Sequence, residues 1–250
     1  MLLFAMWNNY ELEILYKDEY LVAINKPSGL LVHKSMIDRH EIYFAMKMLR
    51  DQIEQWVYPI HRLDKPTSGV LLFALDKNTA KLMSEQFATH SIQKTYIAVV
   101  RGYIDESGFI DHALSVKLDK IADKDVSDLK EPQEAQTQFK RVATVELPHA
   151  VGRYEKTRYS LVELQPKTGR KHQLRRHMKH LSHHILGDTK YGRGEHNKMI
   201  RENYNCHRLL LHATSLEIKH PYTDELLRIE AGFDETFESI FESFLWRFDR

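Results

Sequence analysis

The sequence predicts an α+β fold, in which a mixed, largely antiparallel central sheet is flanked by helices. Apolar or alternating segments typical of strands are interspersed with segments of helical periodicity, without a regular strand–helix–strand repeat. The length of 250 residues is enough to bury a core without cross-links or metals. The single cysteine, Cys206, excludes an internal disulfide.

The first hundred residues predict four strands and two helices. Residues 25–29 are a turn signal, because Pro and Gly punctuate them. Residues 70–75 form an uninterrupted apolar run, which is typical of a buried strand, and Asp76 can cap the helix that follows. The expected strands are residues 12–16, 21–24, 70–75 and 94–101, and the expected helices are residues 41–56 and 77–89.

The second half predicts three more strands and two more helices. A charge-rich stretch, residues 117–135, precedes them and is expected to be a surface excursion or a connection between lobes. Gly169 is expected to open a helix whose buried face carries Leu174, Met178 and Leu181. The C-terminal helix has one apolar stripe, made of Phe237, Ile240, Phe241, Phe244 and Leu245. The expected strands are residues 136–146, 157–165 and 209–218.

The N-terminal segment gives no sign of membrane targeting. Residues 1–7 are apolar, but the segment is too short to span a bilayer and lacks a basic flank. Together with the single cysteine, this predicts a cytoplasmic protein that does not associate with membranes.

Charge is distributed unevenly along the chain, although the formal net charge is only +1. Residues 151–208 contain 14 Lys and Arg against 5 Asp and Glu, together with 7 histidines, whereas residues 221–250 contain 3 against 8. A basic segment of this kind indicates a polyanion-binding face, and an ordinary solvated surface is the equally common alternative.

Residues 61–69, with the sequence HRLDKPTSG, place a carboxylate and a guanidinium in a tight turn before the apolar run. Pro66 and Gly69 favour the turn. Asp64 is therefore expected in a rigid loop at the mouth of a strand, where a scaffold can present a reactive group. A local ion pair between Arg62 and Asp64 is the alternative that these residues alone leave open.

This string resembles the catalytic motif of the RluA-type pseudouridine synthases, HRLD-x-x-TSG, in which the aspartate is essential. Further stretches resemble other motifs of that family in the same order: residues 25–33, 93–102, 166–177, 185–192 and 208–213. His184 departs from the pattern, since the family usually has proline there. The resemblance implies the pseudouridine synthase fold, with two lobes around a central cleft, over residues 11–250. Residues 1–10 are then an N-terminal extension.

The resemblance implies three catalytic residues. Asp64 would act as the nucleophile or as a base toward the ribose. Tyr96 lies in the stretch KTYIAVVRG and would stack on the target base and accept the final proton. Taken alone, a tyrosine on a strand is expected in the core. Arg175, within PKTGRKHQLRRH, would be the basic partner of Asp64.

Six further residues are predicted to contact RNA. Arg62 would occupy the gap that the flipped base leaves, since arginine stacks well on bases, and a purely structural contact is its alternative. The other candidates are His61, Lys26, Arg170, Lys171 and Arg176. The last three belong to a basic segment that could offer side chains and helix N–H groups to phosphate, unless it is only a solvated face.

The implied reaction is the isomerisation of uridine to pseudouridine, which needs no cofactor because no group leaves the RNA. Residues 118–124, 152–159 and 167–177 resemble a branch of the family that modifies tRNA at position 65. This implies a tRNA substrate, handled by a monomer without an obligate protein partner. The alternatives are a synthase that acts on ribosomal RNA or another tRNA site, and an RNA-binding protein without catalysis. An unrelated hydrolase would need a paired carboxylate, which the sequence does not offer.

A cluster of histidines raises one rival, a zinc site. The histidines are His177, His180, His183 and His184, and imidazoles three residues apart on a helix could ligate the ion. Asp188 and Cys206 follow, but not at the spacing of a known zinc motif. The expectation is therefore that no metal is bound.

Overall fold

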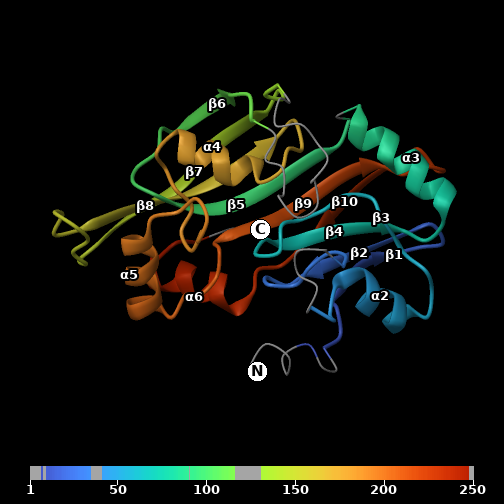
Figure 1. Ribbon diagram of the computed structural model, residues 1–250, viewed down its shortest axis with the longest axis horizontal. Coiled ribbons are helices and arrows are strands. Elements are labelled where there is room, and N and C mark those ends of the chain that lie inside the picture. The colour runs from blue at the N-terminus through green and yellow to red at the C-terminus, as the bar shows by residue number, and fades with distance from the viewer. Residues whose placement is uncertain (1–6, 8–9, 35–40, 90, 116–130, 248–250) are drawn as a thin grey trace. The chain divides into compact units, whose positions relative to one another are not determined.

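The computed structural model describes residues 7, 10–34, 41–89, 91–115 and 131–247. The chain forms two compact units, and Figure 1 labels its helices and strands. Unit 1 contains the described residues up to Ile92, together with Ser215–Ala231. Unit 2 contains the described residues from Gln93 to Thr214 and from Gly232 onward. The expected largely antiparallel sheet with flanking helices is confirmed.

In unit 1 the strand order is β1-β2-β4-β9, with β3 paired to β4 and β10 to β9. The pairs β1–β2, β2–β4, β3–β4 and β9–β10 are antiparallel. Every residue of β4 is buried, as its apolar run predicts. The strands are β1 (Ile14–Lys17), β2 (Leu21–Lys26), β3 (Tyr58–Pro59), β4 (Ser68–Ala74), β9 (Leu211–Lys219) and β10 (Leu226–Glu230).

Two helices belong to unit 1, α2 (Ala45–Ile53) and α3 (Lys77–Ala88). The predicted cap of α3 is confirmed, because the Asp76 side chain accepts hydrogen bonds from the backbone N–H groups of Asn78 and Thr79. Helix α2 is shorter than expected. It ends at Glu54, whose left-handed backbone (φ 54°) cannot continue a helix.

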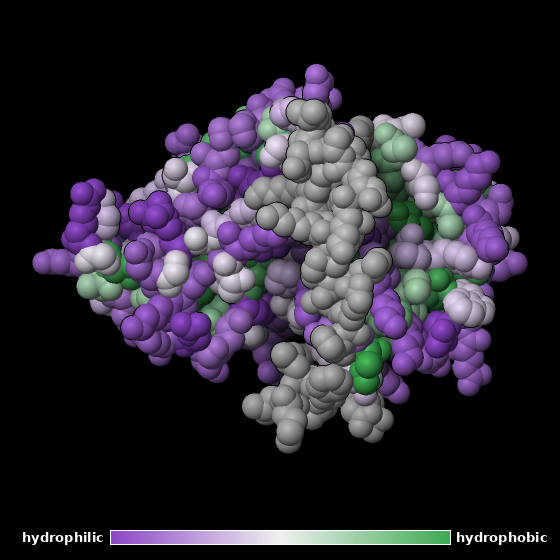
Figure 2. Space-filling view, in the orientation of Figure 1, coloured by the Kyte–Doolittle hydropathy of each residue, from purple (hydrophilic) through white to green (hydrophobic). Residues whose placement is uncertain are grey.

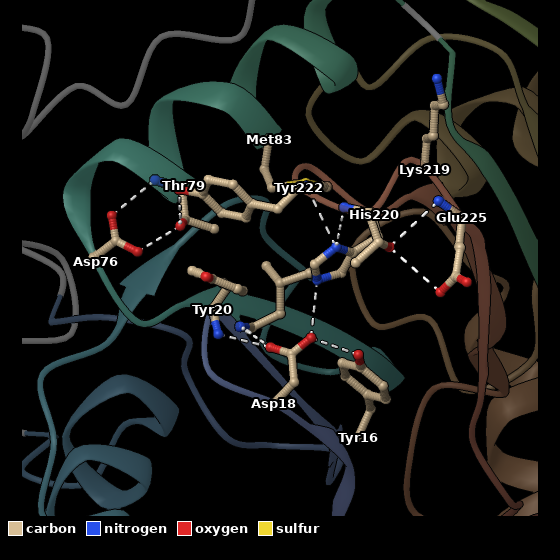
Figure 3. A network of polar contacts seen from close by, with 12 residues as sticks. Tyr16, Asp18, Tyr20, Asp76, Thr79, Met83, Lys219, His220, Tyr222 and Glu225 are labelled. Atoms are coloured by element: carbon tan, nitrogen blue, oxygen red, sulfur yellow. Dashed lines mark hydrogen bonds and ion pairs between the residues drawn. The ribbon is translucent and has the colours of Figure 1, made fainter.

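A partly buried polar network joins the β1–β2 turn of unit 1 to the β9–β10 turn (Figure 3). Asp18 Oδ1 accepts hydrogen bonds of 2.7 Å from the backbone N–H groups of Tyr20 and Leu21. Its Oδ2 accepts one of 2.5 Å from the Tyr16 hydroxyl and lies 2.9 Å from His220 Nε2. Burial works against ionisation of Asp18, but these hydrogen bonds outweigh it and lower its pKa.

In unit 2 the strand order is β9-β5-β8-β7-β6. The pairs β5–β8, β8–β7 and β7–β6 are antiparallel, and Tyr96 of β5 lies opposite Leu164 of β8. The strands are β5 (Gln93–Arg101), β6 (Ser107–Asp111), β7 (Gln136–Leu147) and β8 (Thr157–Pro166), and the helices are α4 (Gln173–His180), α5 (Gly194–Tyr204) and α6 (Glu235–Ser243).

The two faces of this sheet carry separate apolar clusters, because successive residues of a strand point to opposite sides. Ile97 and Val99 of β5 belong to the cluster that contains residues of α5 and α6. Ala98 and Val100 belong to the other cluster, which contains Leu174 and Met178 of α4. Tyr96 packs against this second cluster. The alternation thus assigns Tyr96 to the α4 face.

Several expectations need correction. Gly169 does not open α4: the helix begins at Gln173, after His172 in a left-handed conformation (φ 55°). Leu245 is not part of the apolar stripe of α6 but is 89% exposed, since α6 ends at Ser243, Phe244 is its C-cap and Leu245 has φ 57°. Strands β3, β6 and β10 and helix α5 were not predicted. Of the stretch 117–135, expected to be an excursion, residues 117–130 lie outside the described residues.

No helix in the described part of the chain is both long and apolar enough to cross a membrane. On the face drawn in Figure 2, hydrophilic side chains dominate the described surface, and hydrophobic ones gather only in small separate areas.

Candidate active site

The Asp64 loop lies in unit 1 between β3 and β4. The backbone N–H of Thr67 donates to the Asp64 carbonyl at 3.0 Å and closes the turn that the sequence predicts. Asp64 is half-buried and Arg62 is exposed. The carboxylate is thus presented from a short turn that leads directly into a fully buried strand.

Lys26, the last residue of β2, contacts the backbone of this loop. It is 0% exposed, and its ammonium donates to the carbonyls of Pro27 (2.8 Å), Leu30 (2.8 Å) and Lys65 (3.2 Å). Three carbonyl acceptors match the three donors of an ammonium group. This placement favours a supporting role for Lys26, beneath the residue that follows Asp64, over direct contact with RNA.

Residues 28 and 29 hold the same loop through its backbone. The Gly29 N–H donates to the Lys65 carbonyl at 2.8 Å, and the Ser28 hydroxyl donates to the Pro66 carbonyl at 2.8 Å. Gly29 has φ +88°, a conformation that side chains disfavour. The Lys65 ammonium also pairs with Glu41 at 2.8 Å. The two carbonyls that follow Asp64 are therefore both fixed, which gives the loop a defined position.

His61 and Arg62 differ in their surroundings. His61 Nε2 accepts a hydrogen bond from the Leu72 N–H at 3.1 Å, and its ring stacks on Phe87 with centroids 5.0 Å apart. Arg62 is exposed, and its charge adds to burial in lowering the pKa of His33. Arg62 is therefore accessible to a nucleic acid, whereas His61 packs between β4 and α3 through its contacts with Leu72 and Phe87.

Tyr96 and Arg175 both belong to unit 2, whereas Asp64 belongs to unit 1. Tyr96 is half-buried on β5. It shares the α4 face of the sheet with Leu174, which sits next to Arg175 in the chain. Within unit 2, the phenol and the arginine thus come from the two elements that pack together on this face.

Arg175 makes a bidentate ion pair with Asp188. Its Nε donates to Oδ2 and its Nη2 donates to Oδ1, both at 2.8 Å, and the two side chains are 5% and 1% exposed. The guanidinium carbon lies 5.2 Å from the centre of the Tyr191 ring. The expected pairing of Arg175 with Asp64 stays a prediction.

Asp188 is the residue that the sequence reasoning missed. Burial works to raise its pKa, but the hydrogen bond and charge of Arg175 prevail, and the pKa is lowered. Its Oδ1 also accepts hydrogen bonds of 2.9 Å from the N–H groups of Lys190 and Tyr191. The available signal was the family-like stretch 185–192, in which Asp188 is the only carboxylate and which lies in the basic segment 151–208.

Gln173 organises the loop before α4. Its Oε1 accepts hydrogen bonds from the Thr168 hydroxyl (2.7 Å) and the Arg170 N–H (2.9 Å), and its Nε2 donates to the Gln136 carbonyl at 2.9 Å. This side chain takes the backbone N–H of Arg170 that a phosphate at the helix start would need. The Arg170 N–H, one of the backbone groups expected to face a phosphate, is therefore engaged within the loop, and phosphate binding by the side chains of this segment stays a prediction.

The three predicted basic contacts lie along this loop and helix. Arg170 is half-buried and its Nε donates to the Glu134 carbonyl at 2.9 Å. Arg176 is also half-buried, and its Nη2 donates to the Ser115 hydroxyl at 3.1 Å. Lys171 is exposed. Their contact with RNA remains a prediction.

The histidines predicted as a rival zinc site bind different partners. His183 Nδ1 lies 2.8 Å from the Arg101 carbonyl and His184 Nδ1 lies 2.6 Å from the Tyr191 carbonyl. His177 Nδ1 lies 2.9 Å from the Thr137 hydroxyl, and His180 stacks on His112. Among the described residues, no group of three or more His, Cys, Asp or Glu side chains could hold a metal ion.

Comparison with known proteins identifies the family of this chain. The sequence profile of a family described as RNA pseudouridylate synthase matches residues 20–180, a stretch that includes every candidate from Lys26 to Arg176. Two relatives are called tRNA pseudouridine synthase C. One, from Vibrio parahaemolyticus serotype O3:K6, is 56% identical over 94% of this chain and 96% of its own length. The other, from Haemophilus ducreyi, is 57% identical over 95% and 98%.

The fold has a counterpart among solved structures. Human RNA Pseudouridylate Synthase Domain Containing 4 superposes with a TM-score of 0.68 at 28% identity, covering 95% of each chain. At this level of similarity the two chains share a fold.

Proposed function

Because this chain belongs to the RNA pseudouridylate synthase family, we propose that it isomerises a uridine of tRNA to pseudouridine, with Asp64 as the residue on which the chemistry depends. The observation that carries the substrate is the identity of more than half of all residues with relatives named for tRNA, over nearly their full length. The proposal that Asp64 is the catalytic residue rests on the HRLD motif in residues 61–64.

The reaction conserves all atoms of the RNA. The N1–C1′ bond of uridine breaks, the uracil turns, and C5 forms the new bond to C1′; the proton on C5 then leaves and N1 gains one. A carboxylate in a rigid loop is suited to two roles, attack as a nucleophile or removal of a proton from the ribose. The fixed Lys65 and Pro66 carbonyls hold Asp64 in position for either.

Tyr96 and Arg175 complete the proposed chemistry. A phenol on the strand can stack on the uracil and take the C5 proton in the last step. Arg175, oriented by Asp188 on two of its nitrogens, offers a guanidinium whose direction is set before the substrate arrives. Asp188 is in this account a positioning residue.

A stacked uridine cannot turn, so the target nucleotide must leave the RNA stack, at a cost of a few kcal/mol. Arg62 is exposed and its guanidinium can stack in the space that the base vacates. Basic side chains offset the cost by attracting phosphates. The resemblance of residues 152–159 and 167–177 to the tRNA-modifying branch supports uridine 65 as the target. That the protein acts as a monomer in the cytoplasm stays a prediction.

The substrate is tested with unmodified transcripts of a tRNA that has uridine at position 65, the same tRNA with cytidine there, and ribosomal RNA. We expect one pseudouridine per tRNA by mass spectrometry after nuclease digestion, none in the cytidine transcript and none in ribosomal RNA. Product in ribosomal RNA alone would keep the chemistry and overturn the tRNA assignment.

A further inference from the structure

Lys94 stands out among the half-buried basic residues of unit 2, because the one hydrogen bond that its ammonium makes with the described residues is long. It lies on β5, and its ammonium donates one long hydrogen bond of 3.4 Å, to the Thr168 carbonyl. Within the described part of the chain no Asp or Glu forms an ion pair with it. Partial burial of an ammonium group with one weak acceptor lowers the stability of the folded state, which suggests that Lys94 has a functional role.

A second cation adds to this cost. Burial and the nearby charge of Lys167 lower the pKa of Lys94 to about 8. Lys167 is exposed and precedes Thr168, whose carbonyl contacts Lys94. Two ammonium groups are therefore held near each other, one at the surface and one beneath it.

The alternation of side chains along β5 places Lys94 on the same face of the sheet as Tyr96. Lys94 and Tyr96 are two residues apart on β5, so their side chains leave the same face of the sheet. Glu163, which lies opposite Ile97, belongs to the other face, where Ile97 joins the α5 and α6 cluster. The carboxylate on the neighbouring strand thus points away from Lys94.

The loop that carries Lys167 is fixed rather than free to collapse onto Lys94. Thr168 is 4% exposed and its hydroxyl donates to Gln173 Oε1 at 2.7 Å. The N–H of Lys167 donates to the Gln136 carbonyl at 2.9 Å. The backbone position from which the Lys167 side chain extends is therefore fixed by these contacts.

We propose that Lys94 and Lys167 bind a phosphodiester group of the RNA substrate on the Tyr96 side of the sheet. The proposal rests on the proposed function, since it deepens the recognition of the same RNA. A phosphodiester carries one negative charge and two acceptor oxygens, which suits two ammonium groups that have no carboxylate between them. The exposed Lys167 meets the phosphate first, and Lys94 contributes its charge from below.

A purely structural role for Lys94 makes the opposite prediction for stability. If the hydrogen bond to Thr168 held the fold together, Lys94→Met would lower the melting temperature. If Lys94 is kept for the phosphate, Lys94→Met relieves a buried charge and raises the melting temperature at pH 7, while RNA binding falls. This pair of opposite changes separates the two roles.

Binding is measured without turnover, in an Asp64→Asn background, with the unmodified tRNA transcript at several KCl concentrations. We expect Lys94→Met and Lys167→Met each to weaken binding roughly tenfold, as loss of a charge-assisted contact does. Each should lower the slope of log K against log salt by about 1. Lys198→Met is the matched control, since Lys198 is exposed on α5 and pairs with Glu202; it should change neither quantity.

Ethylation interference locates the phosphate. Transcripts are ethylated at random on their phosphates, bound RNA is separated, and the excluded positions are read for each protein. We expect one or two phosphates that matter to the Asp64→Asn protein but no longer matter once Lys94 is also replaced. An interference pattern and salt slope that Lys94→Met leaves unchanged would overturn the proposal.

The wild-type protein is assayed for pseudouridine on the same transcript. If no pseudouridine forms but the interference depends on Lys94, the proposed function fails and the phosphate site stands. If pseudouridine forms and the interference does not depend on Lys94, the phosphate site fails alone.

Discussion

Arg175 and Asp188 form a buried ion pair in which each side chain is positioned by more than one hydrogen bond. Such a pair gains little stability over apolar residues, because both charges leave water, but removal of one partner strands the other. A costly pair that adds little stability is best explained by the need for an oriented guanidinium. At the residue scale, the role proposed for Arg175 therefore depends on Asp188, which orients its guanidinium.

Arg175→Met is expected to lower the free energy of unfolding by about 3–5 kcal/mol, because it leaves the Asp188 carboxylate buried and unpaired. Urea unfolding measures this. The double variant Arg175→Met with Asp188→Leu should regain most of the stability while remaining inactive. If the double variant is as unstable as the single one, the cost does not come from the stranded charge.

Lys94 gives a pH-dependent prediction. Its folded pKa of about 8 lies below the unfolded value of 10.5, so the folded state binds fewer protons between these pH values and its stability rises with pH. Lys94→Met is therefore expected to be more stable than wild type at pH 7, by at most ~3 kcal/mol before solvent screening is discounted. The difference should shrink to nothing above pH 10.5. A difference that does not change across this range would contradict the assignment.

At the scale of elements, the loop 25–30 acts as a clamp on the Asp64 turn. Lys26 supplies three hydrogen bonds and Ser28 one, all to backbone carbonyls. The HRLD turn and this loop are separated by more than thirty residues in the chain but pair through β2 and β4, where Lys26 lies opposite Gly69.

Lys26→Met is expected to reduce kcat by ten- to a hundredfold, since a small displacement of a catalytic group is costly. Binding of tRNA should change little, because Lys26 is buried. Ser28→Ala removes a single carbonyl contact and should have a milder effect on kcat in the same direction. If Lys26→Met weakens tRNA binding but leaves kcat unchanged, Lys26 contacts RNA and the clamp interpretation is wrong.

The sequence predicted elements where a local signal was strong. The buried run of β4, the Asp76 cap of α3 and the apolar faces of α4 and α6 each follow from spacing. The start of α4 could not be predicted, because Gln173 stabilises a loop through contacts with β7, which lies far away in sequence. The bidentate partner of Arg175 was likewise beyond reach, since only the folded chain brings Asp188 to it.

At the scale of the whole molecule, function depends on charge distribution more than on net charge. The chain has a formal charge of +1, yet its basic residues concentrate between residues 151 and 208. Affinity for tRNA should therefore fall steeply with salt, since each neutralised phosphate releases counterions. Filter binding between 50 and 300 mM KCl measures this, and an affinity that salt does not change would contradict a phosphate-based interface.

Acid stability is a second property of the fold as a whole. The pKa of Asp18 is lowered, so its ionised form stabilises the folded state above the unfolded pKa of 3.8, and this contribution is lost as the pH falls through the folded value. Asp18→Asn should therefore be less stable than wild type at pH 7, and the difference should shrink as the pH falls below 3.8. A constant difference at all pH values would point to hydrogen bonding by the neutral side chain instead.

The most direct test of the account is tritium release from a tRNA transcript labelled at C5 of uridine, with wild type, Asp64→Asn and Asp51→Asn. Asp51 is an exposed carboxylate on α2 and serves as the matched control. We expect release by wild type and Asp51→Asn at similar rates, and none above background by Asp64→Asn, although that variant still folds and binds tRNA. Release by Asp64→Asn at the wild-type rate would show that another residue carries the reaction.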